Sequence, residues 1–130
     1  MKRLVREEGT DVVARLLGRA RAATCRFTEI EISSALARRH REGDLSAAAR
    51  DTAVADLREE LARMDVIELA PAVVAEVHVL LARHALRAGD AVQLAAASVL
   101  RDRSGEVVEF VSWDERLCAA ARAEGFTTRP

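Results

Sequence analysis

The chain has 130 residues, of which 50% are hydrophobic and 32% are charged, and its 20 basic and 21 acidic side chains give a formal net charge of -1. This apolar content excludes a disordered segment, and the length leaves room for one core, so we expect a single domain over residues 1–130. A net charge near zero argues against a protein that holds nucleic acid by bulk electrostatics alone.

Two features of the sequence indicate the cellular compartment of the protein. No run of about 18 apolar residues occurs, and residues 1–8 are too charged to form the apolar core of a signal peptide. Cys25 and Cys118 lie in apolar surroundings without metal-ligand spacing, which indicates reduced packing residues. We therefore expect a cytoplasmic protein with no membrane association.

Helical patterns alternate with short apolar runs along the chain. In order, the patterns predict a helix over 3–21, a strand over 22–27, a helix from Thr28 to a turn at 41–44, a helix over 45–64, a strand over 65–70, a helix opened by Pro71, a helix from Asp90 to about 104, a strand over 107–111 and a helix over 116–124. This alternation predicts an α/β domain with a mainly parallel sheet flanked by helices.

The start of the chain departs from this alternation. A sheet of this kind usually opens with a strand, yet the chain opens in a charged helical pattern. We therefore expect the N-terminal strand to be missing.

Polar side chains lie just after two of the predicted strands and at the start of one helix. Thr28 and Glu31 follow the first predicted strand, Ser112 and Asp114 follow the last, and Asp90 starts a helix of small residues. Ligands of open parallel sheets gather at the carboxyl ends of the strands, so these three places are the ones that could carry chemistry.

Each of these residues also has a purely structural interpretation. Thr28-x-x-Glu31 and Ser112-x-x-Glu115 match the capping box of a helix start, and Asp90 is a typical N-cap residue. Three carboxylates at one sheet edge, however, would repel one another unless a cation neutralised them. Carboxylate oxygens without His or Cys partners suit Mg²⁺ or Mn²⁺.

The order of these residues resembles a known family. The chain carries Thr28-x-x-Glu31-x-x-x-Ala35-Leu36-x-Arg38-Arg39, then Leu86-Arg87-x-x-Asp90-Ala91-x-x-Leu94-Ala95-Ala96-Ala97, then Phe110-Val111-Ser112-x-Asp114-x-Arg116-Leu117. This series resembles the PIN domain, in particular the VapC-type toxins of bacterial toxin–antitoxin pairs, over nearly the whole chain.

The resemblance implies a three-layer PIN-like domain with nuclease activity. It implies that Glu31, Asp90 and Asp114 are the metal-binding and catalytic acids, and that the Ser112 hydroxyl supports the site. The activity implied is an Mg²⁺- or Mn²⁺-dependent endoribonuclease that hydrolyses phosphodiester bonds of an RNA substrate. The partners implied are a cognate antitoxin and a second copy in a homodimer, with the helix over 45–64 offering an apolar surface.

The chain departs from the family at its start, where members have a strand that ends in a catalytic Asp. We expect either a misassigned start codon or a true truncation, and in both cases reduced activity. The alternative function is a catalytically impaired PIN fragment that only binds an antitoxin or another partner.

A basic cluster, Arg38-Arg39-His40-Arg41, has two interpretations. It matches a group of RNA phosphate contacts. It equally matches a solvated helix end, where the helix dipole favours cations.

Overall fold

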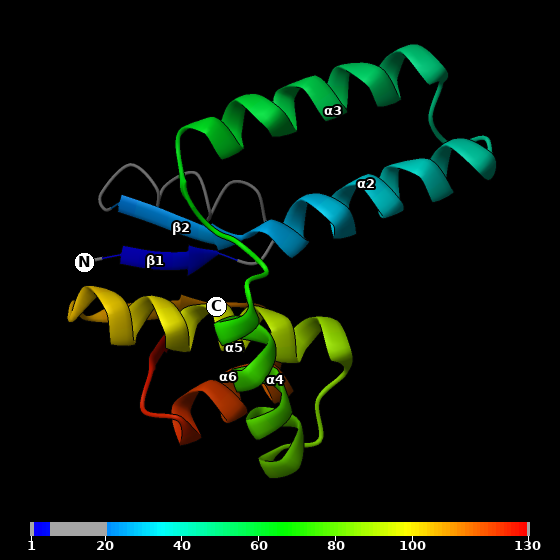
Figure 1. Ribbon diagram of the computed structural model, residues 1–130. Coiled ribbons are helices and arrows are strands. Elements are labelled where there is room, and N and C mark those ends of the chain that lie inside the picture. The colour runs from blue at the N-terminus through cyan, green and yellow to red at the C-terminus, as the bar shows by residue number, and fades with distance from the viewer. Residues whose placement is uncertain (1, 6–20, 130) are drawn as a thin grey trace.

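The computed structural model describes residues 2–5 and 21–129. The described elements, in chain order, are β1 (Lys2–Val5), β2 (Arg21–Cys25), α2 (Arg26–Arg41), α3 (Ala47–Ala62), β3 (Asp65–Ile67), α4 (Pro71–Arg83), α5 (Ala88–Ser104), β4 (Val108–Val111), α6 (Glu115–Ala123) and β5 (Thr127–Arg129) (Figure 1).

The strands form one sheet in the order β3-β2-β1-β4-β5, and every pair is parallel. The predicted α/β class with a mainly parallel sheet is confirmed. Since all the strands run the same way, their carboxyl ends share one edge. The chain proceeds from β1 to β2 and β3 on one side and then crosses to β4 and β5, so the strand order reverses beside β1, where such folds bind ligands.

The first described strand differs from the sequence-based expectation. Lys2–Val5 is extended and lies in the middle of the sheet, paired with β2 and β4, whereas the pattern predicted a helix from Arg3 and a vacant slot in the sheet. Without a middle strand, β2 and β4 would each leave a row of backbone N–H and C=O groups unpaired, and Lys2–Val5 pairs with both. Residues 6–20 of the helix predicted over 3–21 lie outside the described residues, and Arg21 belongs to β2 instead.

Helix α5 is the centre of the core. It contacts α4, β2 and β4, and its residues from Leu94 to Leu100 are all buried. Alanines make up part of this segment, and their small side chains let the helix backbone approach the sheet closely. Phe110 on β4 and Leu117 on α6 complete the same cluster.

Helices α2 and α3 form a long helical pair that extends away from the sheet (Figure 1). The turn between them contains Gly43, whose φ of 83° favours glycine. His40 strengthens this turn, since its Nδ1 lies 2.8 Å from the Leu45 carbonyl oxygen. Most of α3 is exposed, and Leu61 is its one buried residue.

The structure confirms the predictions for Pro71 and the two cysteines, and it contains one strand that was not predicted. Pro71 opens α4 as predicted, and Cys25 and Cys118 are free and buried, as expected for packing residues. Strand β5 was not predicted, because its three residues are mostly exposed and lack apolar alternation. In the described part of the chain, no helix is long and apolar enough to cross a membrane.

Glu124 links the end of α6 to the end of α4. Its Oε2 lies 2.7 Å from His84 Nε2, and its Oε1 lies 2.9 Å from Arg83 Nη1, with the Glu124 side chain 12% exposed. The hydrogen bond from His84, assisted by the charge of Arg83, holds the pKa of Glu124 below its ordinary value of 4.5, although burial opposes this.

Glu124→Gln should therefore destabilise the fold in a pH-dependent way. The lowered pKa means that the carboxylate stabilises the folded state above pH 4.5 and that this contribution is lost as the pH falls through the folded-state pKa. We expect the substitution to lower the free energy of unfolding by about 1 kcal/mol at neutral pH, and by much less near pH 3. Urea denaturation at both pH values measures this, with the exposed Glu59→Gln as control. An equal loss at both pH values would contradict the assignment.

Candidate functional site

Glu31 does not cap its helix. Helix α2 begins at Arg26 with Cys25 as its N-cap, and no side chain makes a cap hydrogen bond there. Thr28 and Glu31 therefore lie inside the helix, and the capping-box interpretation of these two residues is wrong.

The Glu31 carboxylate instead joins a buried polar network. Gln93 Nε2 donates to Glu31 Oε1 and to Thr28 Oγ1, both at 2.8 Å, and Thr24 Oγ1 donates to Thr28 Oγ1 at 2.9 Å. Thr24, Thr28 and Gln93 are all buried, and Gln93 is fully so. This network connects β2, α2 and α5 at the carboxyl end of β2.

Glu31 also lies against the start of α5. A Cβ atom placed on Gly89 would lie 3.2 Å from Glu31 Oε2 and 3.2 Å from Phe27 Cε2, so a side chain at this position would require both groups to shift slightly. The next residue is Asp90, which is 6% exposed. The structure therefore brings Glu31 to the turn of helix that carries Asp90.

Asp90 is not an N-cap either. Helix α5 begins at Ala88 with Arg87 as its N-cap, so Asp90 lies within the first turn. The partial positive charge of a helix N-terminus stabilises a carboxylate at this position. The predicted capping box at the start of α2 and the predicted N-cap of α5 are thus both wrong.

Asp114, in contrast, has a clear structural role. Its Oδ1 accepts hydrogen bonds from the backbone N–H groups of Arg116 at 2.9 Å and Leu117 at 3.2 Å, which makes it the N-cap of α6. Ser112 is buried, and its Oγ accepts from the Asp114 backbone N–H at 3.1 Å. Ser112 thus fixes the turn after β4, and the cap is Asp114 rather than the predicted Ser112.

The three predicted acids do not form one compact cluster. No group of three His, Cys, Asp or Glu residues in the described ranges is arranged to hold a metal ion. Glu31 and Asp114 follow β2 and β4, which lie on opposite sides of β1, so the strand axes are about 10 Å apart. The residues of β1 between them, Lys2–Val5, include no carboxylate.

The sequence-based set of site residues omitted Gln93 and Thr24. Gln93 had a visible signal, because it is the only polar side chain between Ala91 and Ala97. Thr24 had none, since a threonine inside a predicted strand is ordinary.

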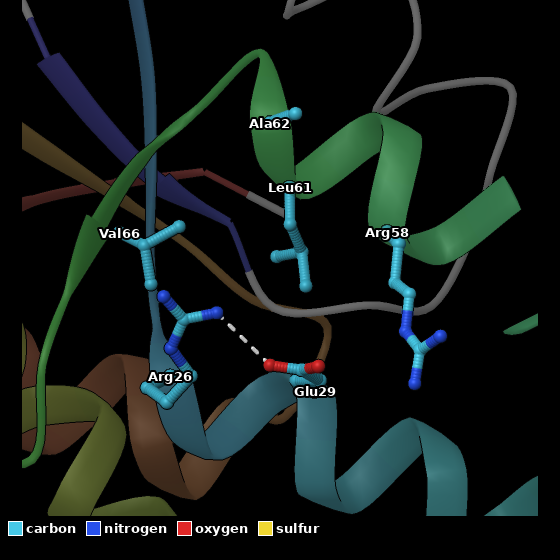
Figure 2. Close-up of a pocket in the computed structure, with 6 residues that line it drawn as sticks. All are labelled: Arg26, Glu29, Arg58, Leu61, Ala62 and Val66. Carbon is cyan, nitrogen blue, oxygen red and sulfur yellow. Dashed lines mark hydrogen bonds and ion pairs between the residues drawn. The ribbon is translucent and has the colours of Figure 1, made fainter. Parts of the chain in front are cut away.

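A separate cavity of about 210 Å³ lies between α2, α3 and β3 (Figure 2). Its lining residues are Arg26, Glu29, Arg58, Leu61, Ala62 and Val66. Arg26 bonds to Glu29 at 2.9 Å across this space and also pairs with Glu68. Glu29 and Glu31 are two residues apart on one helix, so they point to opposite sides, and the cavity is distinct from the Glu31 network.

The basic cluster lies at the far end of α2. Arg38, Arg39 and Arg41 are exposed there, while the His40 ring is occupied at the α2–α3 turn. The three arginines are thus available to solvent or to a ligand.

Comparisons with known proteins support the fold. No family model and no curated protein matches the chain. Among solved structures, a chain of FitAcB from Neisseria gonorrhoeae is similar with a TM-score of 0.63 and 14% identity, covering 100% of this chain and 97% of that one. A chain of a toxin–antitoxin complex from Klebsiella pneumoniae is similar with a TM-score of 0.56 and 14% identity, covering 92% and 91%. The chain therefore shares the α/β fold of these proteins over almost its full length.

The cap at α6 gives a direct test of the Asp114 geometry. Asp114→Ala should lower the free energy of unfolding by about 1 kcal/mol, because two backbone N–H groups lose their acceptor. Asp114→Asn should cost much less, since asparagine caps helices about as well as aspartate. Chemical denaturation of the three proteins measures both effects, and equal losses for the two variants would show that the cap does not matter.

Proposed function

We propose that the chain is a PIN-type, VapC-like endoribonuclease that uses Mg²⁺ or Mn²⁺ to hydrolyse RNA and acts as the toxin of a toxin–antitoxin pair. The observation that carries this proposal is the position of Glu31, which is held by Gln93 at the start of α5, beside Asp90, instead of capping its own helix. The fold shared with chains of FitAcB and of a toxin–antitoxin complex supports the same assignment.

The donor set suits a hard divalent cation. Glu31 and Asp90 would supply carboxylate oxygens from α2 and α5, whereas Asp114 follows β4 on the other side of β1 and is not gathered with them in the described part of the chain. When bound, such an ion would activate a water molecule and stabilise negative charge on the leaving oxygen. The chain's contribution is to hold these oxygens in place before the ion binds.

The neighbouring residues position substrate and acids. Ser112 fixes the backbone of Asp114 through its hydroxyl. Arg38, Arg39 and Arg41 present exposed cations on the same helix as Glu31, with Arg41 about 15 Å further along the helix axis. We propose that these arginines contact RNA phosphates on either side of the cleaved bond.

A partner-binding protein without catalysis is the second candidate. Two observations favour it: the described residues hold no group of three metal-binding side chains, and several large apolar side chains are exposed. Val74 and Leu81 on α4 are 43% and 41% exposed, and Ile30 on α2 is 53% exposed. Exposed apolar side chains of this kind are suited to burial by a protein partner such as an antitoxin.

Asp90→Asn distinguishes the two functions. For the nuclease, we expect Mn²⁺ binding by calorimetry and Mn²⁺-dependent cleavage of a single-stranded RNA, both reduced at least about tenfold by this substitution. The matched control is Asp102→Asn, on the same helix but 77% exposed, which should leave both unchanged.

The absence of both Mn²⁺ binding and RNA cleavage would favour the partner-binding function. A folded wild-type chain that neither binds Mn²⁺ nor cleaves RNA, yet forms a stable complex with the antitoxin encoded beside it, would be a partner-binding protein.

A further inference from the structure

We infer that Gln93 is a positioning residue of this site, whose side-chain amide fixes the Glu31 carboxylate so that Oε2 alone faces the start of α5. The inference deepens the proposed function and rests on it, because it assigns Glu31 one metal-binding oxygen and one oxygen held by the protein.

The chemistry of the partners sets the direction of the Gln93 amide. An ionised carboxylate only accepts hydrogen bonds, so the NH₂ group of Gln93 must face Glu31 Oε1. The second proton of that NH₂ group goes to Thr28 Oγ1 at 2.8 Å. Both donors of Gln93 are therefore committed to residues of α2.

This arrangement leaves the other end of the amide unsatisfied. Gln93 Oε1 is buried and has no hydrogen-bond partner within the described part of the chain. An orphaned buried acceptor costs stability, and an apolar side chain of the same size would avoid that cost. Stability alone therefore does not account for glutamine here, whereas holding the Glu31 carboxylate does.

The amide is itself anchored to the sheet. Thr24 lies on β2 and donates to Thr28 Oγ1 at 2.9 Å, so Thr28 bonds to both the strand residue and Gln93. The sheet thereby fixes Thr28, Thr28 fixes the plane of the Gln93 amide, and the amide fixes Glu31. Rigid supports of this kind preserve the geometry of a ligand-binding carboxylate.

The second carboxylate oxygen of Glu31, Oε2, lies against Gly89. The absence of a side chain there lets Glu31 Oε2 lie where a Cβ would be only 3.2 Å away. One oxygen of Glu31 is thus held by Gln93, and the other lies against the turn that carries Asp90. In the proposed site, Oε2 is the Glu31 oxygen left to bind an ion, and it lies against Gly89, the residue before Asp90.

Gln93→Met tests the inference, because methionine keeps the length of the side chain and removes both donors. We expect Mn²⁺ affinity, measured by calorimetry, to fall about 10- to 100-fold. The matched control is Ser98→Ala on the same helix, where another buried side-chain oxygen has no partner among the described residues. This control should bind Mn²⁺ as the wild type does.

A metal-free measurement examines the contact itself. In nuclear magnetic resonance spectra, the side-chain amide protons of Gln93 should exchange slowly with solvent and should shift in the Glu31→Gln variant. Amide protons that exchange as fast as those of an exposed glutamine would overturn the inference.

The outcomes separate this inference from the proposed function. If Asp90→Asn abolishes Mn²⁺ binding while Gln93→Met binds as the wild type does, the positioning role is wrong and the nuclease proposal stands. If the wild type binds no Mn²⁺, the nuclease proposal fails and the role assigned to Gln93 fails with it.

A second variant covers the case in which Gln93→Met does not fold. Gly89→Ala leaves Gln93 intact and places a Cβ against Glu31 Oε2, so it should also weaken Mn²⁺ binding. Unchanged affinity in this variant would overturn the assignment of Oε2.

Discussion

The burial of α5 is the constraint on which the site depends. This helix is covered by α4 and by strands β2 and β4, and its residues from Gln93 to Leu100 are all buried. A polar side chain in such a helix needs hydrogen-bond partners from a neighbouring element, because water does not reach it. Gln93 finds them on α2, in Thr28 and Glu31. The two hydrogen bonds that the Gln93 NH₂ group donates therefore hold this face of α2 toward α5.

The strand order decides how far the remaining acids converge. Helix α2 continues directly from β2, so Glu31 is near the carboxyl end of that strand, and α5 brings Asp90 to the same place. Asp114 follows β4, on the other side of β1. The middle strand lies between the two groups and carries only Lys2, Arg3, Leu4 and Val5. The two groups of acids are thus separated by β1, and its residues Lys2–Val5 include no carboxylate.

Local sequence signals predicted most of the elements but not the contacts of the candidate site residues. Pro71 and Gly105 mark helix ends by backbone chemistry, so their positions follow from the sequence alone. The strand at Lys2–Val5 was missed because two adjacent apolar residues among cations fit a helix or a strand equally well, and only its neighbours in the sheet decide. Thr28-x-x-Glu31 has the same spacing whether it caps a helix or lies within one. A tertiary partner, Gln93, distinguishes the two cases, and no local pattern contains that information.

Of the three candidate acids, Glu31 and Asp114 share one arrangement of hydrogen bonds. Glu31 uses Oε1 for Gln93, and Asp114 uses Oδ1 for both backbone N–H groups of α6. A carboxylate offers about four lone-pair sites on two oxygens, so one oxygen can be held by the protein while the other remains a ligand. The helix cap made by Asp114 is therefore compatible with metal binding. In the proposed metal site, holding one oxygen of each acid would remove rotational freedom that a bound ion would otherwise have to restrict, and this preorganisation would favour binding.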